Sequence, residues 1–319
     1  MSIERVATNS QTQYLLSQIT QANKALDQSQ AQVSSGKVAN DYAGIGDKTA
    51  ALEAARAAAA RADAYQTNTQ LALTQTDLQD TQLTTLAGLA GQLQKAIQTA
   101  AGNSDGTNLM ETAQTIFQQA SAILNSTDAN GNYIYGGEKT DTAPFTATSM
   151  DAMCQTGNVS DYFVNGSVVK SVQVGDGQTQ KIGVLASNIG VQLMQAIKDL
   201  WTANGGVNGT AVSGQLTSTQ VNSLTSGALP DATSAATALN AATAANGNAY
   251  TSLKDAITNQ ESVSNLYQGF VSDIEDVDMA KALTNLNANQ VALQAALSVA
   301  ARLGQLSLLN YLPSSSSSG

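Results

Sequence analysis

The sequence contains no histidine and only one cysteine, Cys154, among its 319 residues. Without histidine the chain can form neither a Ser-His-Asp hydrolase triad nor a histidine-based metal site. A single cysteine excludes a disulfide within the chain. We expect Cys154 to be a small buried or half-buried side chain, as free cysteine usually is, because nothing identifies it as a nucleophile. The protein is therefore not expected to be an enzyme.

Aromatic and charged residues are also scarce, at 4% and 12% of the chain. The 14 Lys and Arg against 24 Asp and Glu leave a formal charge of −10 and a sequence pI near 4.3. Because no basic cluster is present, we expect binding neither to nucleic acid nor to an anionic membrane surface. With few large side chains, one thick core would be weakly stabilised, so we expect long helices whose burial is completed by neighbours.

Apolar targeting segments are missing as well. The N-terminal residues Met1 to Arg5 lack the basic and apolar stretches that mark a secretory signal. No window approaches the roughly 20 apolar residues of a membrane span. If the protein leaves the cell, we expect it to do so without a cleaved signal peptide.

What the sequence does contain is a seven-residue rhythm at both ends. In the proline-free stretch from Ser272 to Leu312, spacings of three, four and seven place apolar residues on one seam of a helix. This seam consists of Leu283, Leu286, Leu293, Leu297 and Ala300, interrupted at Gln290 and Gly304. The same alternation recurs near the N-terminus, at Leu15, Ile19, Ala22, Leu26, Ser29 and Val33. A seam this narrow requires a partner, so we expect the two ends to pair as halves of one coiled coil.

These seams are the candidate assembly interface. Most amphipathic helices pack within their own chain, so a private helical bundle is the alternative. The terminal position of the seams and the scarcity of large apolar residues favour contacts between subunits, with terminal segments that fold when subunits stack. The candidate interface residues are Leu15, Ile19, Leu26, Val33, Leu283, Leu286, Leu293, Leu297 and Leu306.

The fold class expected is mainly α with a β-rich insert: long antiparallel helices, paired terminal helices and a small β domain mid-chain. Apolar periodicity predicts helices over about 10–34, 48–101, 109–123, 189–201 and from 231 into the C-terminal seam, with every proline outside them. Short β-like pieces lie between 133 and 185, including a hairpin turn at Gly175-Asp176-Gly177. The predicted domains are the two coiled-coil halves, 1–40 and 276–319, the two halves of a helical rod, 41–130 and 236–275, and the outward-facing insert, 131–235.

No stretch predicts catalysis, a cofactor or a metal. The acidic run Asp273, Glu275, Asp276 and Asp278 lacks the glycine-bearing loop and alternating ligands of an EF-hand. We expect it to be a solvated or partner-facing helix segment. The segment from Val174 to Gly177 lacks the Lys-Ser/Thr of a phosphate loop and is interpreted as a turn.

Two motifs on either side of the insert carry a resemblance to a known family. Val33-Ser34-Ser35-Gly36-Lys37 and Ile274-Glu275-Asp276-Val277-Asp278-Met279-Ala280, in this order, resemble the bacterial flagellin superfamily. Three further segments are similar to its hook-filament junction branch more than to filament flagellin: residues 133–137, 140–145 and 306–312. The family usually has a basic residue after Lys37 and paired acidic residues soon after, whereas this chain has Val38 and Asn40-Asp41-Tyr42-Ala43, which leaves a divergent filament flagellin as the alternative.

The resemblance implies a structural role without catalysis or cofactors. Such proteins leave the cell through the flagellum-specific type III export channel and form a short ring between hook and filament. The partners that it implies are further copies of the chain, the hook-side junction protein (hook-associated protein 1), flagellin and a flagellar export chaperone. The resemblance also implies that the terminal helices form an inner coiled-coil layer and that the insert faces outward.

Overall fold

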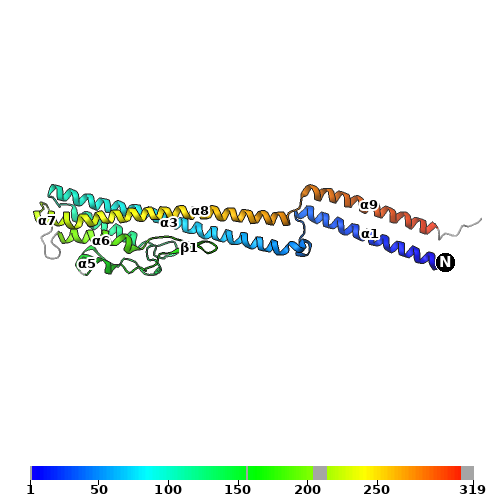
Figure 1. Cartoon of the computed structure of the whole chain (residues 1–319), viewed down its shortest axis with the longest axis horizontal. Coiled ribbons are helices and arrows are strands. Elements are labelled where there is room, and N and C mark those ends of the chain that lie inside the picture. Colours follow the sequence, from blue (N-terminus) through cyan, green and yellow to red (C-terminus); the bar gives the residue numbers. More distant parts are fainter. Residues whose placement is uncertain (1, 156, 204–213, 310–319) are drawn as a thin grey trace, which may run out of the picture. The chain divides into compact units, whose positions relative to one another are not determined.

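The computed structural model describes residues 2–155, 157–203 and 214–309. Within these ranges, the side chains of residues 10–302 are described. The chain divides into two compact units (Figure 1). The first consists of residues 1–60 and 263–319, and the second of residues 61–262. This division groups both termini together; the finer five-part division stays a prediction.

The first unit is built from the two ends of the chain. Its elements are α1 (Ser2–Ser35), α2 (Tyr42–Ile45), η1 (Gly46–Lys48), the first turns of α3 (Thr49–Asn103), the last turns of α8 (Leu229–Glu275) and α9 (Met279–Leu309). α1 ends as predicted at Gly36, whose φ of 71° suits glycine and whose N–H donates to the Gln32 carbonyl at 2.9 Å. The prediction of one continuous helix from 231 into the C-terminal seam is wrong, because the chain leaves the helix between Glu275 and Met279.

The terminal helices α1 and α9 pack against each other and lie side by side (Figure 1), which confirms the predicted pairing. They run antiparallel, because Asn289 of α9 contacts α1 at Ala25 and Ser29, while Val277, before α9, bonds to Gly36.

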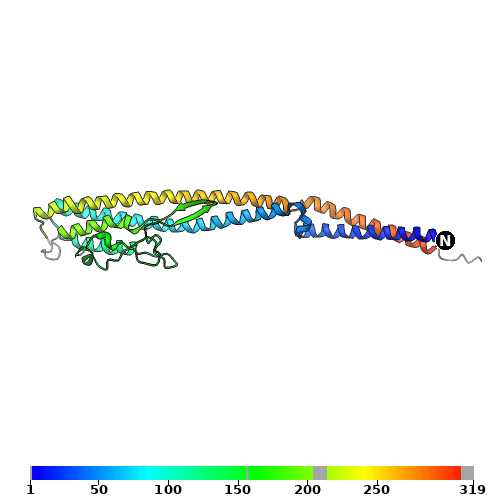
Figure 2. The same ribbon diagram turned by 60° about the horizontal axis from the view of Figure 1, so that its bottom comes forward.

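The second unit is organised by two long helices. α3 runs antiparallel to α8 (Figure 2): the Gln94 amide donates to Thr233 Oγ at 3.0 Å, and the Asn246 amide donates to the Thr76 carbonyl at 2.9 Å. α4 (Leu109–Leu124) and α6 (Ala186–Ala203) complete the helical core. Their apolar positions keep the predicted three-four spacing. The largest buried side chains of this core include Leu86, Leu93, Ile97, Ile116, Leu124 and Ile189.

The insert contains less sheet than the sequence predicts. Within the described residues, strands β1 (Ser171–Gly175) and β2 (Gln178–Lys181) form one antiparallel hairpin, with the predicted turn between them. Tyr133 and Phe163 form isolated bridges rather than strands. Two short helical segments, α5 (Met150–Gln155) and η2 (Val159–Tyr162), interrupt the otherwise irregular chain before the hairpin. The predicted class, mainly α with a small sheet inserted mid-chain, is confirmed.

Pro230 lies inside a helix, against prediction. α7 (Ser218–Ser223) continues through a π-helical turn, η4 (Leu224–Ala228), into α8, and the Leu229 N–H donates to the Leu224 carbonyl. The wider turn directly before Pro230 provides a physical reason. Proline lacks an N–H and crowds the preceding turn, and a π turn relieves both constraints.

Cys154 is buried, as expected, at 4% exposure in the core of the second unit. Burial raises the pKa of its thiol to about 12. The thiol is thus protonated near neutral pH, which agrees with a packing role. Among the described residues, no helix combines the length and apolarity needed to cross a membrane.

Two carboxyl groups share a site where α6 and α8 meet. Asp231 is hydrogen-bonded to Asp199, and desolvation, followed by this neighbour, raises the pKa of Asp231 to about 6. Since the folded value exceeds the unfolded value of about 3.9, the folded state binds the extra proton. The resulting stability is present at low pH and lost as pH rises through about 6.

We predict that Asp231→Asn removes this pH dependence. At pH 8 the variant should be more stable than the wild type by about 1 kcal/mol, a figure discounted because the carboxyl is partly exposed. The difference should disappear at pH 4. Thermal unfolding of both proteins across this range checks the prediction, and a gap that widens towards acid pH would contradict it.

Candidate functional site

The two sequence motifs on either side of the insert meet in the first unit. The Val38 N–H donates to the Glu275 carbonyl at 2.7 Å, and the Val277 N–H donates to the Gly36 carbonyl at 2.9 Å. These bonds tie the end of α1 to the break between α8 and α9. We call this meeting point, residues 36–38 with 275–278, the joint.

A buried carboxylate lies in the joint between two cations. Glu275 Oε1 accepts from Lys37 Nζ at 2.8 Å and from Arg56 Nη2 at 2.7 Å. The hydrogen bonds from Lys37 and then Arg56 hold the pKa of Glu275 below its usual range, although burial opposes them. Arg56 also pairs with Glu53 at 3.0 Å, and Glu53 accepts from the Tyr42 hydroxyl at 2.9 Å. The cluster therefore joins residues from α2, α3, α8 and the chain after α1.

An open hollow of ≈ 610 Å³ adjoins this cluster. Its wall includes Asn40, Asp41 and Tyr42, which belong to the segment that departs from the flagellin pattern. The Asp41 carboxylate accepts from the Gly44 N–H at 2.8 Å and so starts the short helix α2. The segment Asn40-Asp41-Tyr42-Ala43, although it differs from the flagellin pattern, thus forms a defined turn beside the joint.

Three residues of the acidic run, Glu275, Asp276 and Asp278, lie in the joint. The prediction of a solvated or partner-facing helix segment is wrong for Glu275, and Asp276 and Asp278 are exposed but lie outside the helices. Glu275 is buried, and the Asp278 carboxylate accepts from the N–H groups of Ala280 and Lys281, which caps the start of α9. Asp before an apolar run is a helix-start signal that could have located this break. No group of three or more metal-ligand side chains occurs in the described part of the chain.

On the α1 side, the contact between α1 and α9 uses the positions that the sequence predicts. On α1 the residues at the predicted positions are less exposed than their neighbours, and Ser29 is the most buried at 4%. On α9 three predicted positions, Leu286, Leu293 and Ala300, are also half-buried. As far as the side chains of α9 are described, its seam consists of Ala282, Leu286, Asn289, Leu293, Ala296 and Ala300.

Leu283 and Leu297 lie outside this seam, as a correction to the predicted stripe. They are 46% and 49% exposed, while Ala282 is 1% exposed. Gln290 is exposed beside them. The small side chains of Ala282 and Ala296 face α1 instead, which permits close approach of the helices. Leu306 and Gly304 lie within α9, but their surroundings are outside the described part of the chain.

A polar contact crosses the seam at its centre. The Asn289 amide donates to Ser29 Oγ at 2.7 Å and to the Ala25 carbonyl at 3.1 Å. Asn289 was not predicted as a seam residue, because its amide side chain is polar and the predicted seam was defined by apolar residues. Its spacing, three residues after Leu286 and four before Leu293, was the available signal.

The helix pair leaves large apolar side chains exposed. Burying α1 and α9 against each other covers one narrow stripe on each helix, and the remaining faces have no cover within the described residues of this unit. The exposed apolar residues of the two helices are Tyr14, Leu16, Met279, Leu283, Val291, Leu297 and Val299. The arrangement suits association with further helices.

We predict that Glu275→Gln weakens the first unit at neutral pH, because the amide keeps the size but not the charge that Lys37 and Arg56 neutralise. The folded pKa of Glu275 is lowered, so its contribution is present above the unfolded value of about 4.3 and lost as pH falls through the folded value. Helicity followed on heating at pH 7 and at pH 2 measures this. The Tm loss should shrink at pH 2; an equal loss at both values would refute the role of the charge.

Comparison with known proteins shows that α8, the 275–278 side of the joint and α9 lie in a flagellin-like region. Residues 229–312 match the family model of the bacterial flagellin C-terminal helical region. The search of curated proteins gave no match. A solved structure of a Vibrio parahaemolyticus protein described as flagellar hook-associated is similar in fold, with a TM-score of 0.59 and 14% sequence identity. The similarity covers 74% of this chain and 99% of that one. The chain is thus flagellin-like over its C-terminal helical region.

Proposed function

We propose that the protein is a structural component of the bacterial flagellum that assembles through its terminal helices. The observation that carries the proposal is the apolar surface left uncovered on α1 and α9. Five of its seven residues belong to α9, within the region that matches flagellin. The proposal is non-enzymatic, which agrees with the absence of histidine.

Energetics supports association between copies. α1 and α9 contain 34 and 31 residues, so each is about 50 Å long. Half of the residues in their common seam are small or polar, whereas burying one Leu or Val is worth about 1.5–3 kcal/mol. Packing Leu283, Leu297 and Val291 against neighbouring helices would therefore stabilise an assembly more than the isolated pair.

At finer resolution, the proposal is a junction ring that connects the hook to the flagellin filament. The segments 133–137, 140–145 and 306–312 support this through their resemblance to hook-associated protein 3. The ring would contact the hook-side junction protein, hook-associated protein 1, on one side and flagellin on the other. Before export an export chaperone would hold the C-terminal segment, and the final location would be extracellular.

Filament-forming flagellin is the second candidate, because its terminal helices and joint motifs would be shared. Immunogold labelling of isolated flagella distinguishes the two. Signal at one ring beyond the hook supports the junction, and signal along the filament supports flagellin. Absence of the protein from flagella would refute both.

We predict that Leu297→Asp blocks assembly while leaving the monomer folded, because Leu297 lies outside the seam of its own chain. Leu293→Asp should fail earlier, since a carboxylate in the half-buried seam costs several kcal/mol of helix-pair stability. Ala292→Asp is the matched control: it adds the same charge at an exposed position about 140° around the helix from Leu297, and none of its neighbours one turn away is an exposed large apolar residue.

The measurements are circular dichroism of each purified chain and incorporation into flagella by the labelling above. Leu297→Asp should keep wild-type helicity and lose incorporation, while Ala292→Asp should keep both. Normal incorporation of Leu297→Asp would remove this residue from the interface.

A further inference from the structure

A polar cavity in the second unit lies between α3, the loop after α4 and the chain around the β hairpin. Its volume is ≈ 80 Å³, which is room for about three water molecules. It adjoins an open groove of ≈ 850 Å³ and shares with it Gln75, Asp128, Ile134, Lys170 and Ile182. The small cavity is therefore the deep end of a larger recess.

An unpartnered amide lines this cavity. Gln79 of α3 is 0% exposed, and neither its Oε1 nor its Nε2 has a hydrogen-bond partner in the protein. A buried amide without partners destabilises a fold, whereas an apolar side chain of similar size would not. The arrangement is explained if a bound molecule supplies the missing hydrogen bonds.

Gly183 closes one side of this amide. Its φ is 89°, and a Cβ built there would lie 3.1 Å from Gln79 Nε2. Any side chain at this position would press on the amide and strain the backbone. Glycine thus leaves the amide its place at the cavity wall.

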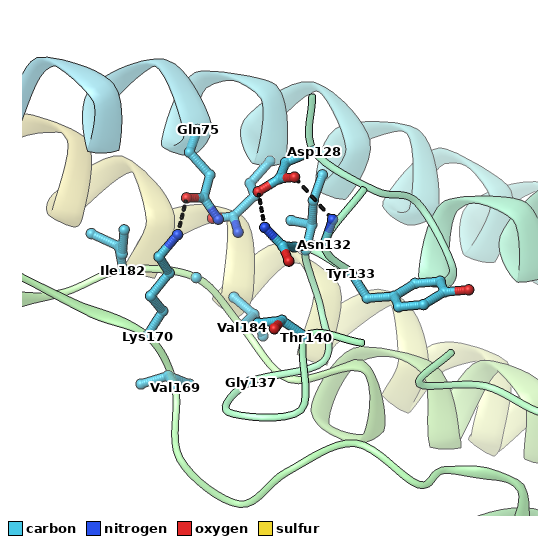
Figure 3. Close-up of a pocket in the computed structure, with 13 residues that line it drawn as sticks. Gln75, Asp128, Asn132, Tyr133, Gly137, Thr140, Val169, Lys170, Ile182 and Val184 are labelled. Carbon is cyan, nitrogen blue, oxygen red and sulfur yellow. Dashed lines mark hydrogen bonds between the residues drawn. The ribbon is translucent and has the colours of Figure 1, made fainter. Parts of the chain in front are cut away.

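The other polar groups of the cavity are already oriented (Figure 3). Lys170 Nζ donates to Gln75 Oε1 at 3.1 Å and keeps two further N–H groups. The Asp128 carboxylate accepts from the Asn132 N–H at 3.0 Å and from the Asn132 side-chain amide at 3.3 Å. Because one ammonium and one carboxylate line the cavity, a neutral occupant fits better than a strongly charged one.

The groove beyond the cavity has apolar walls. Leu71 and Leu78 of α3 are 68% and 44% exposed and lie on it, together with Val172 of β1. A ligand that reaches out of the cavity would meet hydrogen-bonding groups at its inner end and apolar surface along its length. Sugars combine hydroxyl groups with apolar C–H faces in this way.

We propose that the cavity binds a neutral polyhydroxyl ligand of the sugar class, held through the Gln79 amide. The amide presents a donor and an acceptor side by side, and two adjacent hydroxyl groups satisfy both. Lys170 donates to a third ligand oxygen, and Asp128 keeps acceptor capacity for a hydroxyl proton. This binding site is independent of the assembly surface on α1 and α9, since all its residues belong to the second unit.

The test uses the full chain and four probes: glucose, galactose, mannose and N-acetylglucosamine. Saturation-transfer NMR and thermal shift should detect at least one of them with the wild type. Gln79→Leu should bind that sugar about tenfold more weakly or worse, because two neutral hydrogen bonds are lost. Gln92→Leu, the same change at an exposed position of α3, is the matched control and should bind as the wild type does.

A second variant keeps the test decisive if Gln79→Leu does not fold. Lys170→Met changes an exposed residue at the cavity mouth and should also weaken binding. The proposal is overturned if no probe binds the wild type, or if the variants bind it equally well. A rise in Tm for Gln79→Leu without sugar binding by the wild type would show that the cavity holds ordered water only.

Discussion

The structure depends on one shortage: the terminal helices are long, and the chain has few large apolar side chains with which to cover them. α1 and α9 meet along a stripe in which Ala282, Asn289 and Ala296 alternate with larger residues. Such a stripe brings two helices close together but hides little apolar surface. The larger side chains, Leu283 and Leu297, remain beside it at about half exposure. Under the proposed function, association with other helices completes the burial of this unit.

The joint solves a different problem, that of fixing two helices whose shared surface is thin. A carboxylate buried at Glu275 must have partners, and only the arrangement that brings Lys37 and Arg56 together provides both cations. Backbone bonds across the joint, between residues 38 and 275 and between 277 and 36, act in the same direction. Asp231 shows the converse: burial, and after it a neighbouring carboxyl, raises its pKa, whereas cations lower that of Glu275.

Periodicity predicted the helices well because a repeat of apolar residues reports which side of a helix is buried. The positions Leu15 to Val33 on α1 show this. The periodicity prediction failed in part on α9. There the choice of the largest side chains selected Leu283 and Leu297, which lie beside the seam that faces α1. Size identifies apolar surface, but it does not say whether the partner belongs to the same chain. The break at Asp276 and the helix through Pro230 were missed although their signals are local. Asp278 before an apolar run marks a helix start, and proline is tolerated in the first turn of a helix.

Asn289 explains how so thin a seam can still specify one alignment. Its amide reaches Ser29 and the Ala25 carbonyl only in the observed register, and sliding α9 by one turn would leave a polar group facing apolar positions. A polar seam residue lowers the stability of a helix pair and restricts the ways in which it can form. That restriction matters because the same helices carry exposed apolar side chains. If α1 and α9 paired in another register, a different set of these side chains would be exposed to a neighbouring subunit. The contact made by Asn289 fixes the register of α1 and α9. This register in turn decides which face of the helix pair presents the exposed Leu283 and Leu297.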